Sequence, residues 1–284
     1  MPVLLGSDSH MNAAFVVSSD GLFLYHQRLV AHKWLRHGFS LRRGTSGEEV
    51  SCGLNEYQPR ETVLQNRQNL VRTICGADYP LAVLRQIHSD TVITAPPEVH
   101  ASPPEGDGWV TSQAGILLSV QSADCLPVLL VDSQQRVVAA VHAGWRGTVQ
   151  RIGQKAVRLM QTAFSCKPSD CVAVVGPAIR GCCYEVGSEV VEAFRRAFSD
   201  ASCFIAKTPA GKASRPGTKM LDLAEACRRQ LVEIGLAPEN VHADGPCTSC
   251  DTSRFFSHRA EAGRTGRMIA VIGITKPSES HGSE

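Results

Sequence analysis

A cysteine and a histidine stand at matching positions of two apolar runs in this chain. Cys125 opens the run CLPVLLVD and His142 closes the run RVVAAVH. Each lies equally far from the polar pair Ser133-Gln134, so an antiparallel hairpin with a symmetric turn at that pair places the two residues opposite one another. Directly opposed side chains have Cβ atoms about 4.5–5.5 Å apart, which lets them share one ion. A register shift of one residue would separate them.

This pair of side chains suits two kinds of chemistry. A thiolate and an imidazole are common zinc ligands, and they also form the nucleophile and base of cysteine hydrolases. The structural alternative is a buried packing role for Cys125 and a hydrogen-bonded strand-end role for His142. Both residues adjoin polar or glycine-rich segments, where α/β sheets usually carry their chemistry. The functional and structural interpretations both stay open on this evidence.

A catalytic zinc ion takes a third protein ligand and leaves one position open. His88 in RQIHSDTV is the best third ligand because it lies in a polar break between two strand-like runs. The following Ser89-Asp90 can orient its ring. His37 in RHGFS is the second choice. The histidines expected at the surface are His10, His100, His242, His258 and His281.

The elements that must position these residues indicate one large α/β unit. Apolar residues at helical spacing predict helices over 61–76, 148–164, 187–198 and 220–236, the last with Asp222 in its first turn. Strand formers predict a hairpin of 13–19 with 22–27 around Asp20-Gly21, and strands over 171–179 and 268–274. We expect a single domain over 12–275, between a flexible arm of residues 1–11 and a disordered tail of residues 276–284.

The composition argues against several classes of protein. The 284 residues carry 29 basic and 27 acidic side chains, so a net charge of +2 gives no reason to expect nucleic-acid or membrane binding. No apolar stretch approaches the roughly 20 residues that span a bilayer, and no secretory signal opens the chain. A cytoplasmic protein is expected. Most of its 11 cysteines then serve as buried small hydrophobes rather than disulfide partners.

A series of motifs carries a family resemblance from about His37 to Ile274. In order, they include GLN, NRQNL, QIHSD, GDGWVT, SADCLPVLL, AAVHAGWRGT, CYEV and FFSHR with GRTGRM. Together they resemble the YfiH family of laccase-domain proteins, also called polyphenol oxidase or peptidoglycan editing factor. The combination SADC…VHAGWRGT is highly specific to that family.

The resemblance implies a fold, a metal and a reaction. The fold is a layered α-β-β-α sandwich with mixed sheets, of the YfiH and cytotoxic-necrotising-factor type. The metal is one zinc ion (Zn2+) per chain, held by His88, Cys125 and His142. The implied activities are phosphorolysis of adenosine, inosine and methylthioadenosine, and deamination of adenosine, with a nucleoside and phosphate as the small-molecule partners. A zinc ion activates water for attack at the purine C6.

Further residues are candidates for these reactions. Asp124 can take a proton or orient a ligand, or serve only as a turn residue. Guanidinium groups hold phosphate bidentately, and Arg146 is also a catalytic candidate. Asn55 can bind a sugar hydroxyl, although a loop-holding role is favoured. The candidates for substrate or phosphate binding are Arg42, Asn55, Arg67, Arg146 and His37.

The chain departs from the family pattern at several places. Leu41 and Thr45 stand where Thr and Gly are usual, and Ala260 stands where a second arginine is usual. If that arginine contacts substrate, specificity differs here. The CTSC motif at Cys247–Cys250 lacks the second cysteine pair that structural zinc requires at suitable spacing. Its thiols are therefore expected to lie in the core or a loop.

Three other functions remain as alternatives. Copper (Cu2+) binds N/O/S sites tightly, which allows a polyphenol oxidase, although the His-x-His pairs of multicopper clusters are absent from the sequence. A metal-free Cys125–His142 dyad would suit a hydrolase that edits a peptidoglycan precursor. A structural metal would suit a non-catalytic binding protein. The oligomeric state, the preferred nucleoside and the physiological substrate stay open.

Overall fold

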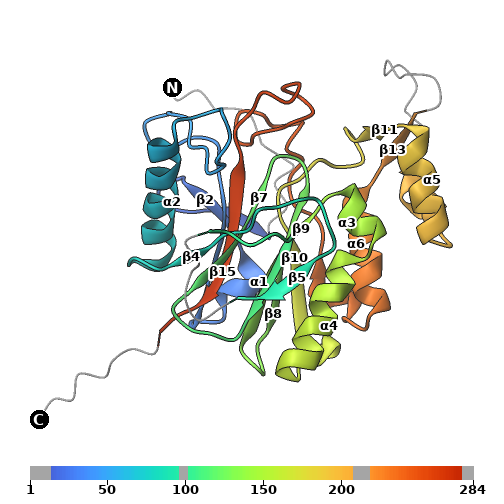
Figure 1. Ribbon diagram of the computed structural model, residues 1–284, viewed down its shortest axis with the longest axis horizontal. Coiled ribbons are helices and arrows are strands. Elements are labelled where there is room, and N and C mark those ends of the chain that lie inside the picture. The colour runs from blue at the N-terminus through green and yellow to red at the C-terminus, as the bar shows by residue number, and fades with distance from the viewer. Residues whose placement is uncertain (1–13, 96–101, 207–217, 277–284) are drawn as a thin grey trace, which may run out of the picture.

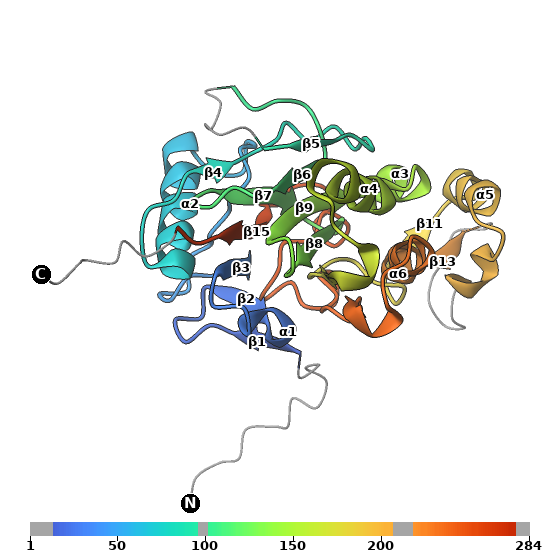
Figure 2. The same ribbon diagram turned by 90° about the horizontal axis from the view of Figure 1, so that it is seen from below.

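A computed structural model of the chain describes residues 14–95, 102–206 and 218–276. The expected arm of residues 1–11 lies outside the described residues, as does the expected tail apart from Lys276. Two large sheets lie face to face in the middle of the molecule, with helices on their outer sides (Figures 1 and 2).

The first sheet has six strands and mixed directions. Its order is β1-β2-β3-β15-β7-β4, antiparallel throughout except for the β4–β7 pair. The expected hairpin around Asp20-Gly21 is confirmed as β1 and β2. The strands are β1 (Phe15–Val17), β2 (Phe23–His26), β3 (Leu35–Ser40), β15 (Met268–Ile274), β7 (Leu117–Ser122) and β4 (Leu81–Ala82).

The second sheet carries the residues singled out by the sequence. Its order is β14-β10-β8-β9-β6-β5, and all seven residues of both β8 and β9 are buried. A strand buried on both faces becomes a continuous apolar run, as these two are. The strands are β14 (Val241–His242), β10 (Cys171–Val175), β8 (Leu126–Asp132), β9 (Val137–Ala143), β6 (Gly108–Thr111) and β5 (Val92–Thr94).

A small third sheet lies beside the second and is formed by three short strands from the second half of the chain. Its order is β11-β13-β12, and all its pairs are antiparallel. The strands are β11 (Glu185–Val186), β13 (Lys219–Leu221) and β12 (Ile205–Ala206).

Three apolar clusters lie between the layers. One, with Ile74 and Val271, lies between α2 and the first sheet. The second, with Phe39 and Leu129, lies between the two large sheets. The third, with Val157, fills the space between the second sheet and helices α4 and α6. The chain is therefore the α-β-β-α sandwich that the family resemblance implied (Figure 2).

The helices agree with the sequence expectations except at two boundaries. The helix expected over 148–164 is divided, because Arg151 adopts a left-handed φ of 64°. The helix expected from residue 220 begins later, because Met220 and Leu221 belong to β13 and the Asp222 carboxylate caps the helix by accepting the Glu225 N–H. The helices are α1 (Gln27–Val30), α2 (Arg60–Cys75), α3 (Trp145–Val149), α4 (Ile152–Phe164), α5 (Ser188–Ala197) and α6 (Leu223–Glu233). None of the helices in the described ranges has the length and apolar content needed to cross a membrane.

The β8–β9 hairpin forms as expected, but the expected register is wrong by two residues. Asp132 pairs with Val137, and Pro127 pairs with His142. The turn is longer than expected because the Asp132 carboxylate accepts two N–H groups within it and Arg136 adopts a φ of 51°. Since side chains alternate with a period of two, a two-residue shift keeps Cys125 on the same face as His142.

The first sheet contains a buried histidine whose protonation opposes folding. His37 in β3 is only 7% exposed, and its Nε2 accepts the backbone N–H of His26 at 3.0 Å. Burial, followed by the charge of His26, lowers the pKa of His37 from 6.5 to about 4. His37 therefore lies in the core as a neutral acceptor, which corrects its expected place at the metal or the substrate.

The native protein is expected to lose stability as the pH falls from about 6.5 to about 4. The unfolded chain takes up the His37 proton in this range and the folded chain does not, so the stabilisation is fully present only above the unfolded pKa. The contribution of His37 is about 3 kcal/mol. Urea unfolding across this range checks it, and His37→Gln should reduce the pH dependence without removing it, because burial also lowers the pKa of His26 to about 4. A wild-type protein of constant stability over the range would contradict the assignment.

Candidate metal centre and its pocket

His142 is held in one orientation by a buried carboxylate. Its Nδ1–H donates to Oδ1 of Asp107 at 2.9 Å, and both side chains are almost completely buried. The backbone N–H of His142 also donates to the Asp107 carbonyl at 2.7 Å. With Nδ1 committed, Nε2 is the atom left to bind a metal. This carboxylate–histidine pair is the usual support of a metal ligand.

The same carboxylate holds the loop that carries His88. Asp107 accepts the backbone N–H groups of Ile87, His88 and Ser89 at 3.3, 3.1 and 2.6 Å, and the Ser89 hydroxyl at 2.7 Å. These bonds hold His88 at a φ of 57°, which is unusual for a residue with a side chain. One buried group therefore positions both histidine ligands.

Asp107 was missed as a site residue, and its role was expected for Ser89-Asp90. The structure instead pairs the Asp90 carboxylate with Lys155. The available signal was a lone acid between two glycines in GDGWV, directly before a buried strand. Its contacts with residues 87–89 and 142 cannot be derived from sequence spacing.

Cys125 completes the candidate site. A ring nitrogen of His88, one of His142 and Sγ of Cys125 all lie within 4.8 Å of one another. Leu126 pairs with Ala143 at the open end of the β8–β9 hairpin, so the next residue on each strand follows the same register. Cys125 therefore lies opposite Gly144. A Cβ at Gly144 would lie 3.2 Å from both Sγ of Cys125 and Cδ2 of His88. The missing side chain at Gly144 therefore leaves room for the ligands to converge.

The electrostatics of the site favour a thiolate. Burial raises the pKa of Cys125, but the charge of His142 and hydrogen bonds from both histidines bring it down to about 6. Burial lowers the pKa of His142, whereas the Cys125 thiolate and Asp107 raise it to about 9. The donor set is thus one thiolate sulfur and two imidazole nitrogens, which suits a catalytic zinc with one open position.

A cavity of about 750 Å³ opens beside these three residues. This volume is within the range of small-molecule sites. Its polar lining is rich in cations, since Arg67, Arg259 and Arg267 all border it together with Tyr184. The cavity therefore suits a ligand that carries an anion and a flat, partly apolar group.

Three of the four arginines that border the cavity are supported from different parts of the chain, and the fourth, Arg85, pairs with Glu105. Arg67 is buried on α2, and its Nε donates to the Cys52 carbonyl while Nη2 has no hydrogen-bond partner among the described atoms. Arg259 donates through Nη1 to the Glu185 carbonyl and stacks on Tyr184 at 5.3 Å. Arg267 donates to two backbone carbonyls. Arg67 is thus a buried cation at the cavity with an uncommitted donor.

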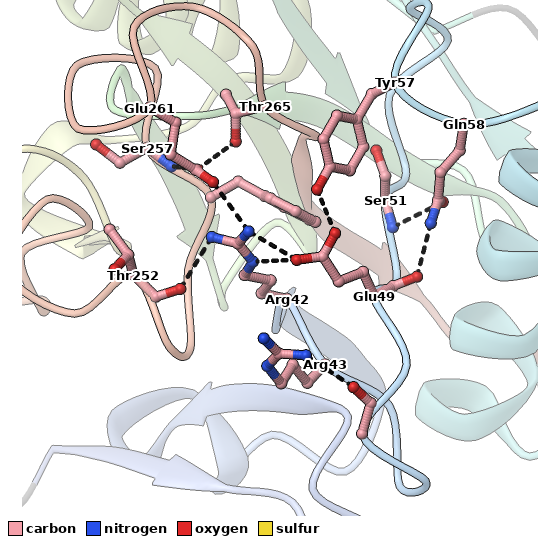
Figure 3. A network of polar contacts seen from close by, with 12 residues as sticks. Arg42, Arg43, Glu49, Ser51, Tyr57, Gln58, Thr252, Ser257, Glu261 and Thr265 are labelled. Atoms are coloured by element: carbon pink, nitrogen blue, oxygen red, sulfur yellow. Dashed lines mark hydrogen bonds and ion pairs between the residues drawn. The ribbon is translucent and has the colours of Figure 1, made fainter.

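Arg42 does not border the cavity, contrary to its expected phosphate-binding role. Figure 3 shows its guanidinium between Glu49 and Glu261, at 2.7 and 2.9 Å, with Nη1 donating to the Thr252 carbonyl. The guanidinium also lies 4.8 Å from the centre of the Phe256 ring. Two carboxylates neutralise its charge, so Arg42 anchors the segment that brings Arg259 to the cavity.

Asp124 borders the cavity and holds two neighbouring segments in place. Both of its carboxylate oxygens are engaged: Oδ1 accepts the Thr248 hydroxyl at 2.6 Å, and Oδ2 accepts the Arg259 N–H at 2.7 Å. Its φ is 90°. Asp124 therefore ties the segments around Thr248 and Arg259 to the chain next to Cys125, and its expected catalytic role stays a prediction.

Two further candidates lie near the cavity without lining it. Arg146 is exposed on α3, with its guanidinium 4.3 Å from the Trp145 ring centre. Its charge opposes the rise in the Tyr184 pKa to about 12, which burial and then Cys125 produce. Asn55 donates through Nδ2 to the Thr265 carbonyl at 3.0 Å, which is the favoured loop-holding role.

Comparison with known proteins agrees with this architecture. Residues 36–275 match the family model described as "Multi-copper polyphenol oxidoreductase laccase". A relative from Deinococcus radiodurans named "Purine nucleoside phosphorylase" is 38% identical over 84% of this chain and 89% of its own. "Adenosine deaminase RL5", from an unknown prokaryotic organism, is 36% identical over 82% of this chain and 92% of its own.

A solved structure shows the same fold. The hypothetical protein YfiH of Bacillus licheniformis matches with a TM-score of 0.83 and 26% identity, over 93% of this chain and all of that one. The fold and the candidate site define an α/β sandwich protein with a His-Cys-His group beside a basic cavity. The chain belongs to the laccase-like YfiH family.

Replacing Gly144 with alanine is expected to weaken metal binding about tenfold, because the added Cβ presses on Cys125 and His88. Competition with a chromogenic zinc chelator measures the effect. Gly187→Ala is the matched control, since Gly187 also caps a helix at a similar backbone conformation and its added Cβ meets nothing within 4 Å. Equal zinc affinities for the two variants would contradict the packing argument.

Proposed function

We propose that the chain is a zinc-dependent purine nucleoside enzyme. Its expected reactions are phosphorolysis of adenosine, inosine and methylthioadenosine, and hydrolytic deamination of adenosine. The observation that carries the proposal is the convergence of His88, Cys125 and His142 beside a cavity lined by arginines. The names of the two relatives point to the same substrates. We place the enzyme in the cytoplasm, where its thiols stay reduced.

Phosphorolysis needs an anion site next to the sugar. An oxygen of phosphate attacks C1′ of the ribose, the bond from C1′ to N9 breaks, and the purine leaves with a proton. Arg67, Arg259 and Arg267 supply the positive charge for phosphate, in place of the expected Arg42. Arg67 is the best of the three because its uncommitted Nη2 is already desolvated.

Deamination needs an activated water at the purine C6. Water adds to C6 and ammonia leaves, which converts adenosine to inosine. A bound zinc ion supplies the Lewis acidity that makes water nucleophilic near neutral pH. The chain's own residues hold the ligand atoms in place through Asp107 and provide the Tyr184 ring as an apolar surface for the purine.

Nucleoside turnover with and without phosphate tests the proposal. Chromatography should show release of free adenine from adenosine only when phosphate is present, together with ribose 1-phosphate. Inosine should form from adenosine whether or not phosphate is present. Release of base at the same rate without phosphate would remove the phosphorylase assignment. No product from any of the three nucleosides in zinc-loaded protein would remove the whole proposal.

A metal-free cysteine hydrolase is the second candidate. The lowered pKa of Cys125 beside His142 also describes a thiolate–imidazolium pair. Copper chemistry has less support, because none of the described residues that line the cavity is a methionine, the usual weak axial ligand of copper sites. Metal analysis of protein purified without chelator separates the three, and zinc that the wild-type protein holds and His142→Ala loses supports the first.

A further inference from the structure

Four cysteines form a second cluster outside the cavity. The sulfurs of Cys182, Cys183, Cys247 and Cys250 all lie within 4.8 Å of one another. Sγ of Cys250 is 3.5 Å from that of Cys182 and 3.4 Å from that of Cys183. In a tetrahedral site with Zn–S bonds of about 2.3 Å, neighbouring sulfurs are about 3.8 Å apart. The four thiols are therefore spaced as the corners of a zinc–thiolate site.

The fold supplies the second cysteine pair that the sequence lacked at suitable spacing. Cys182 and Cys183 lie in the turn that precedes β11, and a bridge between Ala178 and Cys247 brings the CTSC segment to this turn. Thr248 also donates its N–H to the Ala178 carbonyl at 3.0 Å. Cys182 and Cys183 are adjacent in the chain, a spacing that does not by itself indicate a shared ion. The turn directs both sulfurs to Cys250.

The backbone around Cys247 is arranged for a thiolate. The N–H groups of Arg180 and Cys250 both donate to Sγ of Cys247. In a C-x-x-C loop, a bond from the fourth N–H to the first sulfur stabilises the charged form of that sulfur.

A buried cation beside the cluster is the independent observation. Arg180 donates to the Ala243 and Gly176 carbonyls at 2.9 Å, and its Nε is buried with no hydrogen-bond partner among the described atoms. It forms no salt bridge within the described ranges, and the charged groups near enough to stabilise it are Asp222 and Asp244 together with Cys247 and Cys182 of the cluster. Zinc with four thiolates carries a net charge of −2, which would compensate this guanidinium.

We propose that Cys182, Cys183, Cys247 and Cys250 bind a structural zinc ion, separate from the candidate catalytic site. All four ligands come from the protein, so no coordination position is left for a substrate. On binding, the thiols release their protons and each forms one bond to the metal. This adds a second ion to the single zinc expected from the sequence.

The site would fasten two segments of the cavity wall. Tyr184, which borders the cavity, follows Cys183 directly. Thr248 lies within CTSC, is fully buried, and donates its hydroxyl to Asp124. Residues 183 and 247 are far apart in the chain, so joining them through a metal restricts the unfolded state as a cross-link does.

Metal content and zinc-edge X-ray absorption of the whole chain test the proposal. Protein purified under reducing conditions without chelator should hold about two zinc ions, and Cys250→Ser or Cys182→Ser about one. Cys203→Ser is the matched control, because Cys203 is exposed and outside the cluster, and it should keep both ions. In His142→Ala the remaining zinc should show four sulfur neighbours at about 2.3 Å.

Several results would overturn the proposal. These are a single zinc in the wild-type protein that disappears in His142→Ala, a disulfide among the four cysteines in protein kept reduced, and iron in place of zinc. The absorption spectrum of wild-type protein loaded with cobalt, which reports tetrathiolate coordination, keeps the test valid if a serine variant fails to fold. None of these readouts needs nucleoside turnover, so failure of the proposed enzymatic function would leave this test intact.

Discussion

Replacing Cys125 with alanine is expected to remove the zinc ion of the His-Cys-His site and to lower nucleoside turnover about a thousandfold or more. Cys125 contributes the only sulfur to the three donor atoms, and its charge sets the protonation of His142. A bound metal supplies several kcal/mol of transition-state stabilisation, and about 4 kcal/mol corresponds to a factor of about a thousand. Metal analysis and steady-state kinetics on the same preparation measure both effects.

A second substitution separates a ligand from a nucleophile. Cys125→Asp replaces the thiolate with a carboxylate, which also binds zinc. If Cys125 is a ligand, this variant should retain some metal and more turnover than Cys125→Ala. If Cys125 attacks the substrate, the two variants should be equally inactive whatever their metal content. Cys75→Ala is the control, because Cys75 ends α2 and does not border the cavity.

The outcome also decides whether the metal at this site takes part in the reaction. Turnover that survives Cys125→Ala unchanged, with the zinc ion lost, would mean that the metal is not part of the chemistry. Zinc retained in full by Cys125→Ala would mean that the bound ion lies elsewhere, and the four-cysteine cluster is the place to look.

The convergence of the three donors could be predicted from the sequence, although one step in that prediction was wrong. The expected turn at Ser133-Gln134 gave a register two residues from the observed one, because the Asp132 side chain closes a longer turn. Cys125 and His142 still meet, since side-chain direction repeats every two residues. The apolar runs determine which face each residue occupies, whereas turn geometry determines the register.

Side chains that depend on long-range contacts were harder to place. Arg42 was expected to bind phosphate because it lies among glycines, but Glu49 and Glu261 reach it from opposite sides. Glu261 is more than 200 residues away, so no local pattern indicates the pairing. His37 likewise lies in a motif, RHGFS, that suggested a ligand, but its side chain is buried in the core. Residue type and spacing predicted which three candidate donors converge, but not the groups that support them.

Asp107→Asn is expected to weaken zinc binding at the His-Cys-His site about 10–100-fold. The Asp107 carboxylate accepts bonds from three consecutive N–H groups, a hydroxyl and the His142 ring. The asparagine amide has only one oxygen to accept these bonds. Its NH2 group is a donor and would face other donors, so several of the bonds would be lost. The His142 ring then loses its fixed orientation, and the loop that holds His88 at positive φ loses its anchor.

Zinc titration distinguishes loss of the site from loss of the fold. If Asp107 acts by positioning the ligands, excess zinc should restore much of the turnover of Asp107→Asn, and the apparent zinc affinity should fall while the sulfur and nitrogen donors stay the same. Asp90→Asn is the matched control, because that carboxylate pairs with Lys155 at the surface and should leave zinc affinity unchanged. Wild-type zinc affinity in Asp107→Asn would contradict the positioning role. An inactive variant that zinc does not rescue, with its thermal unfolding midpoint unchanged, would instead indicate that Asp107 takes part in the chemical step.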